Sequence, residues 1–314
     1  MANKLIVSLS PHVHGGDSVQ KNMYGVLIAL IPALLVSFYM FGLGAVVVTL
    51  TSVIACLFFE WAITKFILKR ERTTIMDGSA ALTGVLLAFN LPSNLPLWII
   101  IIGALVAIGI GKMTFGGLGC NPFNPALVGR IFLLLSFSQP MTSWLAVENG
   151  KAVEGVFGAT PLAQIAAGET ANLPSLMDMF LGTRGGCMGE TCALALIIGG
   201  IYLIWRKVIT ITIPLSFIGG VFVLSLLFGV DPMYQVLGGG LMIGAFFMAT
   251  DYTTSPITEK GKIIFGLGCA LITMVIRVFG SYPEGVSYSI LLMNIVTPHI
   301  NRMVRNKAFG GVQQ

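Results

Sequence analysis

The sequence contains little charge. Asp, Glu, Lys and Arg make up 10% of its 314 residues, whereas soluble domains carry about 25%. Its mean hydropathy is +0.89, and a soluble chain this apolar would lack the polar side chains needed to cover its own surface. The scarcity of charge therefore excludes an ordinary soluble domain and predicts an integral membrane protein.

Sequences that bind nucleotides or metal clusters are also missing. No Gly-x-Gly-x-x-Gly fingerprint follows a strand, and no Walker loop occurs. We therefore expect any NADH or ATP chemistry to belong to partner subunits. Of the five cysteines, only Cys187 and Cys192 lie close together, and iron–sulfur clusters use sets of three or four. A disulfide and two free thiols both stay open for this pair, and no metal site is predicted.

Long apolar stretches recur along the whole chain. A membrane-spanning helix needs about 20 mainly apolar residues, and fewer where the helix is broken. The sequence therefore predicts an all-α polytopic membrane protein of about ten spans. The candidate spans are residues 24–42, 44–66, 78–92, 96–111, 124–138, 190–205, 209–229, 233–250, 262–280 and 285–301.

The basic residues indicate the direction of these spans, because cytoplasmic segments of membrane proteins are enriched in Lys and Arg. With residues 1–23 and 302–314 as cytoplasmic ends, only Lys151 and Arg184 fall in outer segments. The net charge of +5 follows from this bias, so no nucleic-acid partner is expected. Predicted to be cytoplasmic are Lys4, Lys21, Lys65, Lys69, Arg70, Arg72, Lys112, Arg206, Lys207, Lys260, Lys262, Arg302, Arg305 and Lys307.

The longest polar segment, residues 139–189, divides the chain into two halves, residues 24–138 and 190–301. Each half holds five candidate spans. Because five is an odd number, the halves would insert in opposite directions. This is the layout of inverted repeats, which often place a binding site between the halves.

Glu60, Arg130 and Arg277 are charged residues that lie inside the predicted spans, away from the first and last residues of each span. Charge inside a membrane is costly and is usually paired or functional. Glu60 lies about one turn before Lys65, which predicts an ion pair between them at the cytoplasmic boundary. For Arg130 and Arg277, a structural partner and a role near a bound group both stay open.

A motif of small residues lies in the long polar segment. Residues 155–162 read Gly-Val-Phe-Gly-Ala-Thr-Pro-Leu. Gly158 and Ala159 leave the backbone open to close approach, and the hydroxyl of Thr160 is expected to be exposed beside them. Pro161 stiffens the chain that follows. An ordinary turn would also fit this pattern.

Three further stretches accompany this motif. Residues 10–14 read Ser-Pro-His-Val-His, residues 77–84 read Asp-Gly-Ser-Ala-Ala-Leu-Thr-Gly, and residues 116–126 read Gly-Gly-Leu-Gly-Cys-Asn-Pro-Phe-Asn-Pro-Ala. Together the four stretches are similar to the family of the Rnf complex D subunits and the B subunits of the sodium-pumping NADH:quinone reductase. The resemblance covers nearly the whole chain. A first span that begins near Tyr24 favours the D type, since the B subunits carry a longer N-terminal extension.

The resemblance implies a fold and cofactors. The fold would resemble the urea channel, with inverted five-helix repeats. FMN would be joined to Thr160 by a phosphoester in the outer loop, next to Gly158 and Ala159, and Arg184 is a candidate ligand for its phosphate. A second, non-covalent flavin (riboflavin) would lie between the halves. Where the family usually has Asp and Ser or Thr, this chain has Glu154 and Phe157.

The resemblance also implies a function: relay of electrons through FMN, coupled to Na⁺ or H⁺ transport, in a bacterial inner-membrane complex of the ferredoxin:NAD⁺ oxidoreductase type. Its partners would be the other Rnf subunits, membrane lipid and an extracytoplasmic flavin transferase. The alternatives are a quinone-reductase B subunit and a stand-alone channel for a small polar solute. A channel would need no flavin anchor at Thr160.

Overall fold

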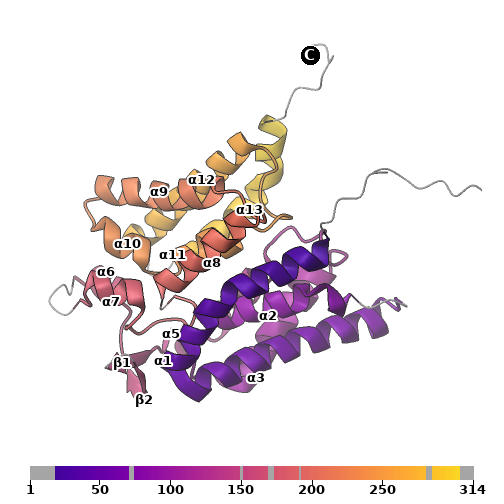
Figure 1. The fold of residues 1–314 in the computed structure, drawn as a ribbon, viewed down its shortest axis with the longest axis horizontal. Helices are drawn as coiled ribbons and strands as arrows, with labels where there is room; N and C mark the ends of the chain where they lie inside the picture. Colours follow the sequence, from indigo (N-terminus) through magenta and orange to yellow (C-terminus); the bar gives the residue numbers. More distant parts are fainter. Residues whose placement is uncertain are drawn as a thin grey trace, which may run out of the picture.

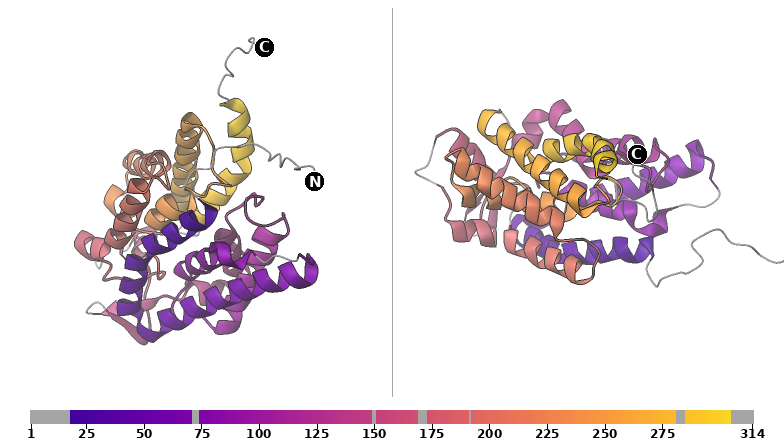
Figure 2. Two further views of the ribbon diagram at one scale, coloured as in Figure 1. Left: turned by 45° about the vertical axis from the view of Figure 1, so that its right-hand side comes forward. Right: turned by 90° about the horizontal axis from the view of Figure 1, so that it is seen from above.

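The computed structural model describes residues 18–70, 74–148, 151–168, 173–190, 192–280 and 285–304, without the side chains of Glu148 and Glu154. The Ser-Pro-His stretch of residues 10–14 lies outside these ranges. Two bundles of helices lie side by side, the first drawn from indigo to magenta and the second from orange to yellow (Figure 1). Two further views show the same division (Figure 2).

The first bundle begins with one long, bent helix. Ser18 caps helix α1 by accepting a hydrogen bond from Lys21 N at 3.1 Å. Gly42 interrupts α1 with φ 61° and ψ −142°, a conformation that favours glycine. This break separates the predicted spans 24–42 and 44–66. The elements of this bundle are α1 (Val19–Ala62), η1 (Ile63–Ile67), η2 (Ile75–Asp77), α2 (Ser79–Phe89), α3 (Leu97–Leu105), η3 (Val106–Met113) and α4 (Pro125–Ser136).

A β hairpin and short helices connect the two bundles. Strands β1 (Leu145–Glu148) and β2 (Lys151–Phe157) pair antiparallel, with Leu145 opposite Phe157. The prediction of an all-α chain is therefore wrong in this segment. The reason is local, because β-branched and aromatic residues such as Val153, Val156 and Phe157 favour strands. The helices of this connection are α5 (Ser138–Thr142), α6 (Pro161–Ala166) and α7 (Leu176–Leu181).

The second bundle contains a broken helix where the sequence predicts one span, at residues 233–250. Gly239 and Gly240 have φ of 62° and 68° and interrupt the helical stretch there. The elements of this bundle are α8 (Ala193–Trp205), α9 (Thr212–Leu227), α10 (Pro232–Leu237), α11 (Leu241–Ile243), η4 (Gly244–Met248), α12 (Glu259–Phe279) and α13 (Val286–Met303).

The described helices match the predicted spans in position. By length and composition, Val19–Ile67 and Glu259–Phe279 are long and apolar enough to cross a membrane. Each of the other predicted stretches coincides with one or more helices. The number of crossings and the inverted repeat stay predictions. Shorter apolar helices occur at Ser79–Phe89, Leu97–Met113, Pro125–Ser136, Ala193–Trp205 and Thr212–Leu227.

Helix α7 begins with a capping box that predicts a local dependence on pH. The Asp178 carboxylate accepts hydrogen bonds from the hydroxyls of Ser175 at 2.6 Å and Thr183 at 2.8 Å. These hydroxyls hold the pKa of Asp178 below its usual range. A lowered carboxyl pKa stabilises the folded state above the unfolded pKa of about 4, and this stabilisation is lost as the pH falls through the folded pKa.

We therefore expect hydrogen-exchange protection of residues 176–181 to fall as the pH drops below about 4. In the Asp178→Asn variant, protection at neutral pH should already be low, with little further change on acidification. An equal loss of protection in both proteins would show that another group is responsible.

Candidate cofactor sites

Thr160 lies where the β hairpin leads into helix α6. It is the N-cap residue of α6, and its hydroxyl oxygen accepts a hydrogen bond from Ala163 N at 3.3 Å. Threonine suits this position because it satisfies a free N–H group of the first turn, and Pro161 suits the next one. Capping draws the hydroxyl towards the helix, and Thr160 is only 8% exposed. The expectation of an exposed hydroxyl is therefore wrong for this conformation.

The residues just before Thr160 are open. Phe157, Gly158 and Ala159 are all exposed, and the N–H of Gly158 donates to the carbonyl of Trp144 at 3.0 Å. This bond extends the hairpin by one residue and holds the backbone in place. The predicted motif thus has an exposed backbone at Gly158 and Ala159 and a buried hydroxyl at Thr160.

Arg184 is buried at 5% exposure, not solvated as an ordinary loop arginine would be. Its Nη2 donates to the carbonyls of Glu190 at 2.9 Å and Leu237 at 2.7 Å, so that it joins the connecting segment to the second bundle. Burial lowers the pKa of the Arg184 guanidinium, an effect that the nearby Glu190 opposes. Its Nε is buried without a hydrogen-bond partner. This Nε is the donor that a phosphate could use, and that role stays a prediction.

A second buried arginine contacts the end of helix α10 and the glycine turn that follows it. Arg277 of α12 donates from Nη1 to the carbonyl of Gln235 at 2.5 Å and from Nη2 to that of Gly238 at 3.1 Å. A Cβ at Gly239 would stand 2.5 Å from both Arg277 Nη2 and Leu162 Cδ1. Helix α6, which Thr160 caps, therefore packs against Arg277 at a turn that only glycine fits.

Arg130 and Glu190 form a third buried polar group. Arg130 Nη1 donates to Asn90 Oδ1 at 2.5 Å, and its Nη2 lies 3.9 Å from Glu190 Oε1. Glu190 is 7% exposed and accepts from Cys187 Sγ at 3.2 Å. These contacts favour the structural alternative for Arg130, and those of Arg277 favour it there as well.

The cysteines carry free thiols. All five are unbridged, and Cys187 and Cys192 are both buried. Burial raises the pKa of the Cys187 thiol, with Glu190 as a further cause in the same direction. The thiol of Cys192 caps α8 by accepting from Ala195 N at 3.4 Å. Of the alternatives for this pair, the structure has the free thiols.

Glu60 is paired with a different lysine from the one predicted. Its Oε2 lies 2.6 Å from Lys112 Nζ, and its Oε1 accepts from the Thr74 hydroxyl at 2.6 Å. Lys65 instead lies over the ring of Trp61, 5.4 Å from its centroid. The predicted Glu60–Lys65 pair is therefore wrong, because the π-helix η3 brings Lys112 into the interior next to Glu60.

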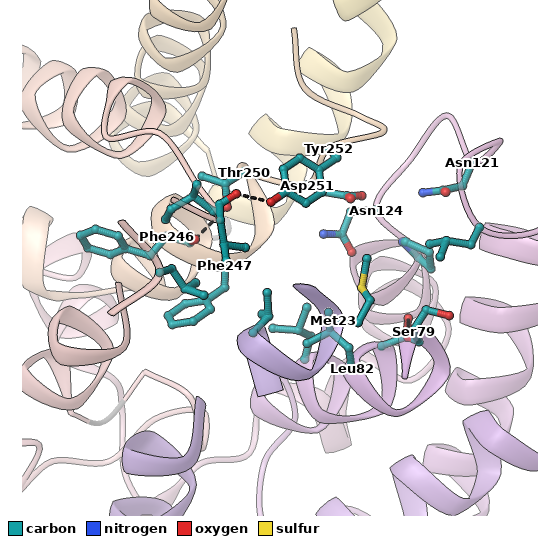
Figure 3. Close-up of a pocket in the computed structure, with 18 of the residues that line it drawn as sticks. Met23, Ser79, Leu82, Asn121, Asn124, Phe246, Phe247, Thr250, Asp251 and Tyr252 are labelled. Atoms are coloured by element: carbon teal, nitrogen blue, oxygen red, sulfur yellow. Dashed lines mark hydrogen bonds between the residues drawn. The ribbon is translucent and has the colours of Figure 1, made fainter. Parts of the chain in front are cut away.

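A cavity lies between the two bundles and draws its lining from both (Figure 3). Its volume is about 80 Å³, or about 700 Å³ with the space open to solvent included. Met23, Leu82, Phe246 and Phe247 provide apolar walls, and Lys112 reaches it from η3.

Several polar groups of this cavity come from two breaks between helices, one in each bundle: residues 114–124 between η3 and α4, and residues 249–258 between η4 and α12. Asn124 of the first break faces Thr250 and Asp251 of the second across the cavity (Figure 3), and its Nδ2 donates to the carbonyl of Met248 at 3.2 Å. Asn121 Oδ1 is buried with no partner. An acceptor of this kind suits a ligand that offers an N–H group.

The sequence analysis missed the Glu60–Lys112 pair and the burial of Glu190. One signal was available for the first, since an acid inside a span is usually paired, and a base on a neighbouring span can be its partner. Lys112 directly follows the predicted span 96–111. Nothing in the sequence around Glu190, the first residue of the predicted span 190–205, indicated that it would be enclosed among arginines.

The fold and these sites define a helical membrane protein with two bundles, a cavity between them and a threonine-capped loop motif. The family model described as NQR2, RnfD, RnfE matches residues 6–310. The chain therefore belongs to this family, and the resemblance stated from the motifs is confirmed.

Several curated proteins are similar over nearly their full length. The chain is 49% identical to the D subunit of the Na⁺-translocating ferredoxin:NAD⁺ oxidoreductase complex of Acetobacterium woodii, over 98% of this chain and 95% of the relative. It is 43% identical to the D subunit of the proton-translocating ferredoxin:NAD⁺ oxidoreductase complex of Clostridium ljungdahlii, over 98% and 97%. It is 37% identical to the D subunit of the ion-translocating oxidoreductase complex of Stutzerimonas stutzeri, over 94% and 93%.

Proposed function

We propose that this chain is the D-type membrane subunit of an ion-translocating ferredoxin:NAD⁺ oxidoreductase complex. The relatives support this type over a quinone-reductase B subunit, because all three named above are D subunits of such complexes. The ion is Na⁺ or H⁺, and both occur in the names of the relatives. The chain acts with the other subunits of the complex and is not expected to be active alone.

We further propose the predicted topology: ten spans in two inverted five-helix repeats within a bacterial inner membrane, with both ends cytoplasmic. In Figure 1 the described start of α1 and end of α13 lie away from the β hairpin, α6 and α7. This arrangement supports an outer position for the connecting segment. Membrane lipid would surround the exposed apolar faces of the helices.

The observation that carries the function is the geometry at Thr160. An exposed Gly158–Ala159 pair leads directly to a threonine hydroxyl at the end of a hydrogen-bonded hairpin. Threonine oxygen can form a phosphoester, and a flavin held in this way needs no binding affinity to stay in place. A flavin accepts electrons in pairs and releases them singly, which side chains do not do. Arg184 Nε is the candidate partner of the phosphate.

The buried state of Thr160 adds one requirement. Because its hydroxyl caps α6 and is 8% exposed, an extracytoplasmic flavin transferase needs α6 to open locally, or acts before α6 packs. A six-residue helix held mainly by its cap and its packing can open at low cost.

A second, non-covalent flavin in the cavity between the bundles is part of the proposal. The apolar walls from Leu82 and Phe247 suit a ring system, and the free acceptor of Asn121 suits a ring N–H. A flavin bound in this cavity would contact both halves and would stabilise one position of the halves relative to each other.

The covalent flavin is tested by in-gel flavin fluorescence of the denatured complex, produced together with its transferase. We expect a fluorescent band at this chain, and its loss in Thr160→Asn. Asparagine also caps helices well, so this variant removes the attachment oxygen while keeping α6 capped. Thr160→Ala removes both and should additionally lower stability by about 1 kcal/mol.

A dark wild-type band, with the transferase active on another target, would overturn the covalent flavin. A band that persists in Thr160→Asn would place the attachment at another residue. The channel alternative would then be tested by solute flux.

A further inference from the structure

A groove opens beside the hairpin that precedes Thr160. Its volume is about 650 Å³, within the range of ligand pockets. Three segments far apart in sequence line it: the bend of α1 at Gly42, the turn after α2, and the hairpin itself. The hairpin and the bend lie at the same end of the first bundle (Figure 1).

Three of the side chains that line the groove are aromatic, and one is basic. Tyr39 and Phe157 are largely exposed at 72% and 59%, whereas Phe41 is 7% exposed and contributes a buried wall. Lys151 Nζ lies over the ring of Tyr39, 5.8 Å from its centroid. These groups suit a flat, aromatic ligand that can carry negative charge.

The groove also contains a polar group that lacks a partner. Ser93 lines it at 6% exposure, and its Oγ is buried without a hydrogen bond. A buried hydroxyl without a partner costs free energy, and most such groups in folded proteins are satisfied. A ligand with hydrogen-bonding atoms at its edge would satisfy this one.

We infer that this groove holds the isoalloxazine ring of the flavin attached to Thr160, an inference that rests on the proposed function. The ring stacks against Tyr39 and Phe157, Ser93 bonds to a polar ring atom, and Lys151 faces the negative charge of the reduced ring. The stacking restricts the ring, and the lysine favours its reduction.

The covalent geometry fits this position. Phe157 lies three residues before Thr160, and three residues span at most about 10 Å. FMN carries its ring at the end of a five-carbon chain, so the ring lies away from the residue that bears the phosphate. The backbone between them is open at Gly158 and Ala159.

The other cavity beside α6 fits the ring less well. It is lined by Leu162, Ile165, Gln235 and Arg277 among others, with a volume of about 190 Å³. Among the described residues that line it, none is aromatic, and the Arg277 donors already bind backbone carbonyls of the neighbouring turn. The groove at Tyr39 supplies the aromatic contacts that the cavity beside α6 lacks.

The test uses the native, purified complex with flavin attached. Tyrosine in contact with a flavin ring quenches its emission by electron transfer, so Tyr39→Leu should raise the emission of the covalent flavin. Tyr24→Leu is the matched control, a partly exposed tyrosine at the other end of the same helix segment. The Thr160→Asn complex supplies the background from any other flavin.

A second measurement addresses the charge. Lys151→Gln should lower the midpoint potential of the covalent flavin, because the reduced ring loses a nearby positive charge. Lys151→Arg keeps the charge and should keep the potential. A role of Lys151 in lipid binding alone would leave the potential unchanged in both variants.

The outcomes separate the inference from the function on which it rests. Raised emission in Tyr39→Leu together with a lower potential in Lys151→Gln would support the groove as the ring site. An intact in-gel band with unchanged emission and potential would overturn the groove while the covalent flavin stands. Loss of the wild-type band would overturn both, and Tyr39 and Lys151 would then be interfacial anchors of the membrane boundary.

Discussion

Replacing Lys112 by methionine is expected to lower the free energy of unfolding by about 3–5 kcal/mol, as for other buried ion pairs that lose one partner. Glu60 and Lys112 are 0% and 2% exposed, and their carboxylate and ammonium groups lie 2.6 Å apart. Methionine keeps most of the side-chain volume but leaves Glu60 charged and unpaired in the interior. The large effect therefore comes from the remaining acid more than from the lost bond.

The surrounding network sharpens this expectation. Lys112 Nζ also donates to Ser79 Oγ at 2.6 Å, and the Ser79 hydroxyl donates to Asp77 Oδ1 at 2.5 Å. The lysine thus joins η3 to the start of α2 as well as to α1. Its loss should loosen three segments of the first bundle together.

The measurement is thermal unfolding in detergent, with a double variant as control. Glu60→Gln combined with Lys112→Met removes both charges and keeps an acceptor for Thr74, so it should regain most of the stability lost in Lys112→Met. A single variant as stable as the wild type, or a double variant no better than the single one, would contradict this explanation.

Replacing Glu190 by glutamine is expected to have the second large effect, again about 3 kcal/mol or more. Glu190 lies 3.9 Å from Arg130 Nη2 and is buried with Arg130, Arg184 and Arg277, which are 4%, 5% and 7% exposed. It is also the acid whose charge acts on both Arg184 and Arg277. Glutamine retains the shape and the hydrogen-bonding oxygen, so that the change isolates the charge.

Glu259 is the matched control for this prediction. It pairs with Lys262 at 2.7 Å, but its side chain is 60% exposed. Glu259→Gln should cost less than about 1 kcal/mol, because water screens surface ion pairs. Equal losses in the two variants would show that burial of Glu190 is not what makes its charge important. Adding Arg130→Met to Glu190→Gln should recover part of the stability.

Much of the fold followed from apolar content and length alone. Each of the ten predicted spans coincides with helical structure, because a long apolar stretch in lipid must satisfy its backbone internally as a helix. The sequence analysis did not predict the hairpin of residues 145–157, because it considered the polar segment only as a stretch without a membrane span. The break at 233–250 was also missed, although three consecutive glycines stand at 238–240.

The candidate site was predictable only in part. The motif at Thr160 could be recognised in one stretch of sequence, because its small residues and proline are adjacent. A local motif does not show whether the Thr160 hydroxyl is buried, because its burial depends on how α6 is capped and packed. Arg184 was found as a basic residue in a loop. Its two acceptors are the carbonyls of Glu190 and Leu237, and Leu237 belongs to the second bundle, 53 residues away in sequence.

The sequence by itself determined that this is a membrane protein, where its helices lie, and to which family it belongs. These properties depend on composition, local periodicity and short motifs. Only the tertiary structure decided that Glu60 pairs with Lys112, that Glu190 is enclosed among three arginines, and that a groove joins Tyr39, Ser93 and Lys151. Each of these depends on contacts between segments more than 50 residues apart, and the pairing of charges and the closing of cavities follow from how the helices pack.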